Sequence, residues 1–102
     1  MKTTIEEVDG KIVATLVGDL DTAAAQETEM ALQPLLQCEG KDIIIDCTDL
    51  EYIASSGLRI LLSILKQAKI VGSRVVLKNV NEVVYDVLSL TGFVSIFEFV
   101  NA

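Results

Sequence analysis

The chain has 102 residues, a length that fits one domain, and 51% of its residues are apolar. Its formal net charge of −7 disfavours binding to nucleic acid and to anionic membrane surfaces, because both would repel it. The apolar residues form short blocks, shorter than the ~18 consecutive positions of a membrane span, and the first residues lack a signal-peptide core, so we expect a cytoplasmic protein with no direct membrane insertion.

The first expected elements are two strands joined by a tight turn. Asp9 and Gly10 separate two apolar runs, and this dipeptide is a strong signal for a two-residue hairpin. The sequence therefore predicts an antiparallel pair of strands at residues 4–8 and 11–17.

A change from alternating to helical spacing follows the second strand. Asp21 or Thr22 can cap a helix in which Met30 and Leu32 belong to the apolar positions. Pro34 has no backbone donor, so it predicts either a kink in this helix or a separate last turn.

The middle of the chain predicts a strand followed by a long helix. Residues 42–47 form a continuous run rich in β-branched side chains, which is typical of a strand covered on both faces. The helix is expected over residues 56–70, with Gly72 ending it. Its apolar face is marked by leucines at spacings of three and four: Leu58, Leu61, Leu62 and Leu65.

The last part of the chain completes an α/β pattern. We expect a strand at residues 74–80, a helix with Asn81 as its cap, and a final strand at residues 95–100. The element order β-β-α-β-α-β-α-β predicts right-handed crossovers between parallel strands. The fold class is therefore α/β, a single small domain with packed helices on a mixed, mostly parallel sheet whose strand order stays open.

Composition excludes several kinds of catalytic site. The chain has no histidine, which removes Ser-His-Asp and Cys-His catalysis. Its two cysteines, Cys38 and Cys47, are isolated, so they predict free thiols and no metal set. We expect neither enzyme activity nor a cofactor or metal.

Functional groups in such folds gather where a strand passes into the next helix, and Ser55 and Ser56 occupy such a position. A nucleophile elbow would need a glycine in place of Ile53 and a histidine base, and the chain has neither. A phosphate cradle would need a glycine-rich loop, and the acidic side chains nearby would repel a free anion. These are Asp46, Asp49 and Glu51.

Beside the phosphate cradle, which stays open as the weaker alternative, the residues alone leave two interpretations of Ser55. As a helix N-cap it would stabilise the fold by about 1 kcal/mol, and the abundance of serine caps favours this interpretation. As a phosphoacceptor it would place a charge of about −1.5 to −2 at a helix start that tolerates an anion, so the charge would act on a docked partner.

Several stretches resemble one family. Residues 46–93 read DCTDLEYIASSGLRILLSILKQAKIVGSRVVLKNVNEVVYDVLSLTGF, and GDLDTAAA precedes them at residues 18–25. Together they resemble a STAS domain, in particular the stand-alone anti-sigma factor antagonists. The resemblance covers nearly the whole chain, so residues 1–102 are expected to form one STAS domain.

The resemblance implies a function by partner switching. In that family the unphosphorylated antagonist binds an anti-sigma factor that is also its serine kinase, which frees the sigma factor. Phosphorylation of one serine at the strand-helix junction abolishes this binding, and a PP2C-type serine phosphatase restores it. By position the acceptor here is Ser55, in a chain expected to be monomeric and not to bind nucleic acid.

The resemblance also implies a surface that meets the partner. Asp21 matches an acidic residue beside the phosphoacceptor and would contact the partner or help to place ATP and Mg²⁺ in the kinase complex. Well-studied antagonists have an aspartate where this chain has Ala54. The expected partner-binding residues, several of them in a loop at residues 49–54, are Asp21, Asp49, Glu51, Ala54, Ser56, Gly57 and Arg59.

A second function class is open to the same fold. STAS domains also serve as accessory subunits of lipid transporters and as parts of sensory complexes. In such a role Ser55 would not be regulated by phosphorylation and would be an ordinary helix cap.

Overall fold

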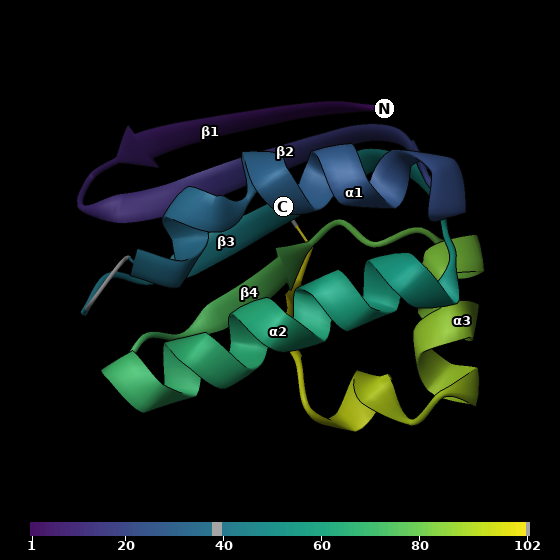
Figure 1. The fold of residues 1–102 in the computed structure, drawn as a ribbon. Helices are drawn as coiled ribbons and strands as arrows, with labels where there is room; N and C mark the ends of the chain where they lie inside the picture. Colours follow the sequence, from purple (N-terminus) through teal and green to yellow (C-terminus); the bar gives the residue numbers. More distant parts are fainter. Residues whose placement is uncertain (38–39, 102) are drawn as a thin grey trace.

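The structure is a computed structural model that describes residues 1–37 and 40–101. Cys38, predicted to be a free thiol, lies outside the described residues. The elements follow the predicted order (Figure 1). They are β1 (Lys2–Val8), β2 (Lys11–Leu20), α1 (Thr22–Ala31), the 3-10 helix η1 (Gln33–Gln37), β3 (Ile43–Ile53), α2 (Ser55–Val71), β4 (Val75–Lys78), α3 (Glu82–Leu90), the 3-10 helix η2 (Phe93–Ser95) and β5 (Glu98–Val100).

Within the described residues, five strands form one mixed sheet in the order β1-β2-β3-β4-β5. β1 pairs antiparallel with β2, and the pairs β2–β3, β3–β4 and β4–β5 are parallel. The predicted α/β class is confirmed, and the strand order that the sequence left open is sequential. α1 and α2 lie side by side over one face of the sheet (Figure 1).

The hairpin between β1 and β2 has the geometry that its sequence predicts. Asp9 and Gly10 both have positive φ, at 52° and 77°. Positive φ at both central residues matches a type I′ turn, whose twist suits the flanking strands. The turn fixes the register in which Val8 pairs with Lys11.

The first helix confirms its cap and corrects its buried face. Asp21 is the N-cap, and its Oδ1 accepts a hydrogen bond from the Ala24 N–H at 2.9 Å. Thr28 is 2% exposed, whereas Met30, placed among the apolar positions by its hydrophobicity, is 69% exposed. Pro34 lies in η1, which confirms the separate turn rather than the kink.

The prediction that the middle strand is covered on both faces is wrong. Ile43 and Ile45 are buried beneath the helices, while Ile44 between them is partly exposed. Both helices next to β3 in the chain lie on one face (Figure 1), so alternate residues of the strand face away from them.

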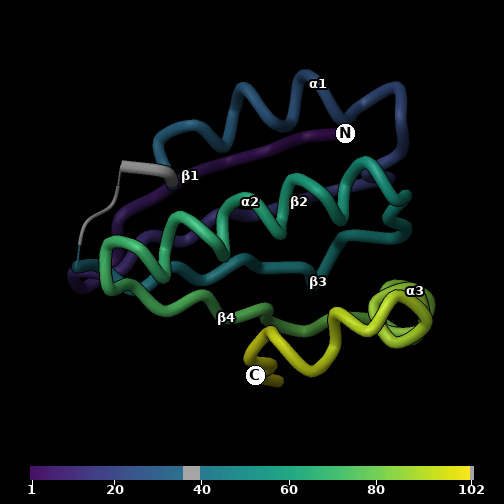
Figure 2. The backbone as a smooth tube through the Cα atoms, turned by 60° about the horizontal axis from the view of Figure 1, so that its bottom comes forward, coloured from purple at the N-terminus to yellow at the C-terminus, as the bar shows by residue number. Residues whose placement is uncertain are grey.

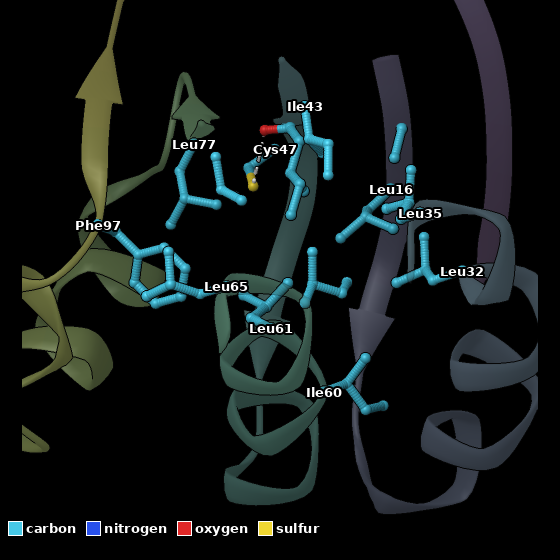
Figure 3. Close-up of a cluster of buried hydrophobic side chains, with 14 of the residues drawn as sticks. Leu16, Leu32, Leu35, Ile43, Cys47, Ile60, Leu61, Leu65, Leu77 and Phe97 are labelled. Carbon is cyan, nitrogen blue, oxygen red and sulfur yellow. Dashed lines mark hydrogen bonds between the residues drawn. The ribbon is translucent and has the colours of Figure 1, made fainter. Parts of the chain in front are cut away.

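The core lies between α2 and the sheet (Figure 3). Leu58, Leu61 and Leu65 of the predicted leucine face are buried, and Leu62 is partly exposed. Figure 3 shows the Cys47 thiol in this core, where it donates to the Ile45 carbonyl at 3.5 Å. Burial, with a smaller contribution from Asp46, raises the pKa of Cys47 to about 12, so the thiol is neutral and unreactive.

The C-terminal elements are shorter than predicted. β4 ends at Lys78, because Asn79 takes a left-handed conformation with φ of 56° that turns the chain out of the strand. The predicted strand at residues 95–100 is reduced to β5, and residues Phe93–Ser95 form η2 instead. Asn81 is confirmed as the cap of α3.

Candidate functional site

The starts of α1, α2 and α3 lie at one end of the sheet (Figure 2). This follows from topology, since parallel strands β2, β3 and β4 all deliver the chain to the same edge. The start of α2, at Ser55, belongs to this edge. The structure therefore places the predicted phosphoacceptor where α/β folds gather functional groups.

Helix α2 begins one residue earlier than predicted, and its N-cap is Ala54. The prediction that Ser55 caps the helix is therefore wrong, because Ser55 is the first helical residue. The β2–β3 ladder extends through the donation of the Ala54 N–H to the Leu20 carbonyl at 2.9 Å. Ala54 is thus held extended, at φ −93° and ψ 171°, and takes the cap position without a side chain that can cap.

The Ser55 side chain is exposed, and no hydrogen bond to its hydroxyl occurs within residues 1–37 and 40–101. The next serine differs, since Ser56 donates to the Thr22 hydroxyl at 3.4 Å and touches the start of α1. The first N–H groups of a helix have no partner inside the helix, and no side-chain cap is provided here. The site therefore combines an exposed hydroxyl with unpaired backbone donors.

Gly57 lets α2 approach the sheet directly beneath these serines. It is buried, and a Cβ added to it would lie 2.7 Å from Leu20 Cγ and 2.9 Å from Ile53 Cγ1. Contacts this short are not tolerated between carbon atoms, so a side chain would push the helix away. The structure gives Gly57 a packing role under the predicted surface.

The remaining predicted residues are distributed over three elements. Asp21 is partly buried and occupied as the α1 cap. Asp49 and Glu51 are exposed but lie on β3, which runs to Ile53, so the expected loop at residues 49–54 is wrong. Arg59 is exposed on α2, one turn after Ser55.

A carboxylate at the point where β3 leaves β4 is organised by its neighbours. Asp46 Oδ1 accepts from the Thr48 N–H at 3.0 Å and from the Thr48 hydroxyl at 2.6 Å. Partial burial raises the pKa of Asp46, but the two hydrogen bonds and the charge of Lys78 together outweigh burial and lower it. The Asp46 side chain is therefore a charged acceptor within the strand.

A surface pocket between α1 and α2 was not predicted from the sequence. Its volume is about 160 Å³, with Ser56, Arg59 and Glu29 around it and Ile60 in its lining. Periodicity could have placed residues on the facing sides of each helix, but not the distance between the two helices. The pocket extends the surface beside Ser55 along α2.

The described part of the chain contains no group of three side chains suited to holding a metal ion. None of its helices is long and apolar enough to cross a membrane.

A helix start with unpaired N–H groups favours negative charge, so a phosphate on Ser55 would be tolerated locally. The arrangement thus suits reversible modification of an exposed hydroxyl.

Comparison with known proteins links this geometry to a family. The family model described as STAS domain matches residues 2–102. The Bordetella bronchiseptica protein BtrV, which is described as a proposed anti-sigma factor antagonist, is 33% identical to this chain over 102 residues. The match covers 100% of this chain and 88% of BtrV.

Solved structures share the fold. A Thermotoga maritima protein, provisionally described as an anti-sigma factor antagonist, matches with a TM-score of 0.85 and 26% identity, over 98% of this chain and 86% of its own. The anti-sigma factor antagonist SpoIIAA in its unphosphorylated form matches with a TM-score of 0.81 and 22% identity, over 99% and 88% of the two chains. The phosphorylated form of Bacillus SpoIIAA matches with a TM-score of 0.76 and 21% identity, over 99% and 91%.

Proposed function

The chain belongs to the STAS domain family, and from this premise we propose that it is an anti-sigma factor antagonist that acts by partner switching. Unphosphorylated, it binds an anti-sigma factor that is also its serine kinase, and phosphorylation of Ser55 releases that partner. The observation that carries the proposal is the exposed Ser55 hydroxyl at the uncapped start of α2.

The proposed reaction is phosphoryl transfer to the Ser55 oxygen. That oxygen attacks the γ-phosphorus of ATP held by the kinase, the bond to the bridging oxygen breaks, and ADP leaves. The hydroxyl proton passes to a base on the kinase. A PP2C-type serine phosphatase reverses the step by hydrolysis.

The fold supports a phosphate at this position without being disrupted. A helix N-terminus carries roughly half a positive charge, and its unpaired N–H groups can donate to phosphate oxygens. SpoIIAA matches this chain in both its unphosphorylated and phosphorylated forms, with TM-scores of 0.81 and 0.76. We expect the modification to change the surface of the domain rather than its fold.

The effect on the partner follows from desolvation and bulk. Binding the phosphorylated form would bury a doubly charged group at the interface, which costs several kcal/mol. The surroundings add to this cost, because β3 already carries Asp49 and Glu51 on its exposed positions. A loss of about 3 kcal/mol corresponds to a fall in affinity of roughly a hundredfold.

The first test is the intact mass, with site mapping, of the protein isolated from its native cells in two growth states. We expect one phosphate on Ser55 in one state and none in a Ser55→Ala strain. No phosphate in either state, with the protein abundant, would contradict the proposal and favour the unregulated accessory subunit of a lipid transporter or sensory complex.

The second test asks whether charge at this position controls binding. Tagged wild type and Ser55→Ala should retain the same partner from native cells, whereas Ser55→Asp should lose it by roughly a hundredfold. Ser89→Asp is the matched control, since Ser89 is also an exposed helical serine but lies on α3, outside the lining of the pocket between α1 and α2. Equal retention by Ser55→Asp and wild type would contradict the switch.

A further inference from the structure

The end of β3 that leads to Ser55 has different neighbours on its two sides. On one side, pairing with β2 continues to Ile53 opposite Leu20, and the Ala54 N–H extends it. On the other side, pairing with β4 stops where Asp46 meets Lys78. Residues 47–53 of β3 therefore extend beyond the strand beside them.

Two asparagine side chains meet β3 on the side where β4 has ended. The Asn79 side-chain nitrogen donates to the Thr48 hydroxyl at 3.0 Å. The Asn81 side-chain nitrogen donates to the Leu50 carbonyl at 2.9 Å and lies 3.4 Å from the Glu51 carbonyl. The Asn81 amide therefore supplies a donor where a neighbouring strand would otherwise provide one.

The same Asn81 side chain also caps α3. Its Oδ1 accepts from the Val84 N–H at 2.8 Å, and its backbone carbonyl accepts from the Tyr85 N–H at 2.9 Å. One partly buried residue thus ties the start of α3 to the end of β3, between groups 31 positions apart in the chain.

The residue type is informative, because capping alone does not require asparagine. Aspartate and serine cap helices about as well as asparagine. A carboxylate has no donor, and a serine hydroxyl is too short to accept from Val84 and donate to Leu50 together. Both ends of the Asn81 amide are in use, one as the donor to Leu50 and the other as the acceptor from Val84.

We infer that Asn81 is a positioning residue for Ser55. By holding the Leu50–Glu51 carbonyls, it fixes the last residues of β3 and so the Ala54–Ser55 junction that follows them. The structural part of this inference stands alone, and its consequence for phosphorylation rests on the proposed function. Substituting Asn81 should loosen the junction even where the α3 cap is kept.

Amide hydrogen exchange tests the structural part. In Asn81→Asp, which retains a capping oxygen but loses the donor, we expect the Ala54 amide to exchange roughly five- to tenfold faster, the effect of one lost hydrogen bond. The Val84 amide should remain protected, since the carboxylate still accepts from it. Asn81→Ser is a second variant that adds no charge, and its shorter hydroxyl cannot both cap α3 and reach the Leu50 carbonyl.

Val83→Gly is the matched control. Val83 is 53% exposed on α3, and glycine there weakens the helix without touching the β3 contact. In each variant the Ala54 exchange rate is compared with the average exchange rate of the whole domain. If Val83→Gly raises this ratio as much as Asn81→Asp does, the effect is general destabilisation and the inference is overturned. Unchanged Ala54 exchange in both Asn81 variants would also overturn it.

Phosphate occupancy tests the consequence. Protein from native cells carrying Asn81→Ser should contain severalfold less phosphate on Ser55 than wild type at equal abundance, while Val83→Gly should match wild type. Equal occupancy in Asn81→Ser and wild type would overturn the link to Ser55. If wild type carries no phosphate, the proposed function fails, and the Ala54 exchange still decides whether Asn81 positions the junction.

Discussion

Helices α1, α2 and α3 start at the same end of the sheet (Figure 2). Among the described residues, a side chain caps the starts of α1 and α3 but not that of α2. Asp21 caps α1 and Asn81 caps α3, each accepting a backbone N–H within hydrogen-bond distance. α2 starts after Ala54, which cannot do so. Two capped starts beside one bare start show that the fold can supply caps here and omits one next to Ser55.

The omission is tolerated because α2 is stabilised by burial instead. α1 extends over 10 residues and buries Thr28, whereas α2 extends over 17 and buries residues along its whole length. A cap contributes about 1 kcal/mol, less than burying one large apolar side chain. A helix packed as α2 is can leave its first N–H groups unpaired, and those groups are then available to a phosphate.

The largest expected effect on stability comes from the close packing of α2 against the sheet at Gly57. Gly57→Ala should lower the free energy of unfolding by about 2 kcal/mol, because the new Cβ would lie 2.7 Å from Leu20 Cγ. This direction opposes helix propensity, which favours alanine over glycine by about 1 kcal/mol. The shift in urea midpoint, at unchanged m-value, measures it.

Two variants separate this clash from other effects of the change. Ser63→Ala on the exposed side of α2 should leave the midpoint nearly unchanged. In a Leu20→Ala background, Gly57→Ala should cost less than in wild type, since the nearest atom that the new Cβ would meet is gone and only the contact with Ile53 Cγ1 stays. A stabilised Gly57→Ala protein would show that α2 does not depend on this close approach.

A medium effect on stability is expected from adding a cap to the start of α2 and from removing the cap of α1. Ala54→Asn should add about 1 kcal/mol to the free energy of unfolding, because the extended backbone at Ala54 already suits a cap. Asp21→Ala should subtract a similar amount from the capped start. Thermal or urea unfolding of both variants checks the pair, and no gain from Ala54→Asn would mean that the bare start is already satisfied.

The same comparison shows which parts the sequence could predict. The Asn81 cap, the Asp9-Gly10 turn and the choice of Asp21 or Thr22 as the α1 cap are predictable, because each depends on residues within three or four positions. The cap at Ser55 is not, because the choice between Ala54 and Ser55 is made by the Leu20 carbonyl on another strand. Interactions between nearby residues determine the element types, whereas pairing between β2 and β3 determines where α2 starts.

The candidate site shows the same division between what the sequence predicts and what depends on contacts between distant elements. Motif resemblance located Ser55, and the structure shows that its hydroxyl is exposed, a property that sequence spacing does not determine. The second role of Asn81 could not be predicted, because its donor reaches a carbonyl 31 positions away. The pocket between α1 and α2 depends on the same kind of distance between elements.

The smallest expected effect concerns a side-chain acceptor that serves a strand rather than a helix. Asp46 accepts from the Thr48 N–H as Asp21 does from the Ala24 N–H, and its pKa is lowered in the folded chain. A lowered folded pKa contributes stability above the unfolded value of about 3.9, and this contribution is lost as the pH falls through the folded value. Because Asp46 is partly solvated, we expect only a few tenths of a kcal/mol.

The urea midpoints of wild type and Asp46→Ala, compared at pH 7 and pH 3, measure this contribution. The difference between the two proteins should be present at pH 7 and smaller at pH 3, because the unfolded chain takes up a proton on Asp46 at a higher pH than the folded chain does. Asp49→Ala on the same strand is the control, because no hydrogen bond involves its side chain within the described residues. A difference that grows toward pH 3 would contradict the sign, and would mean that Asp46 is a strained charge rather than a strand counterpart of the helix caps.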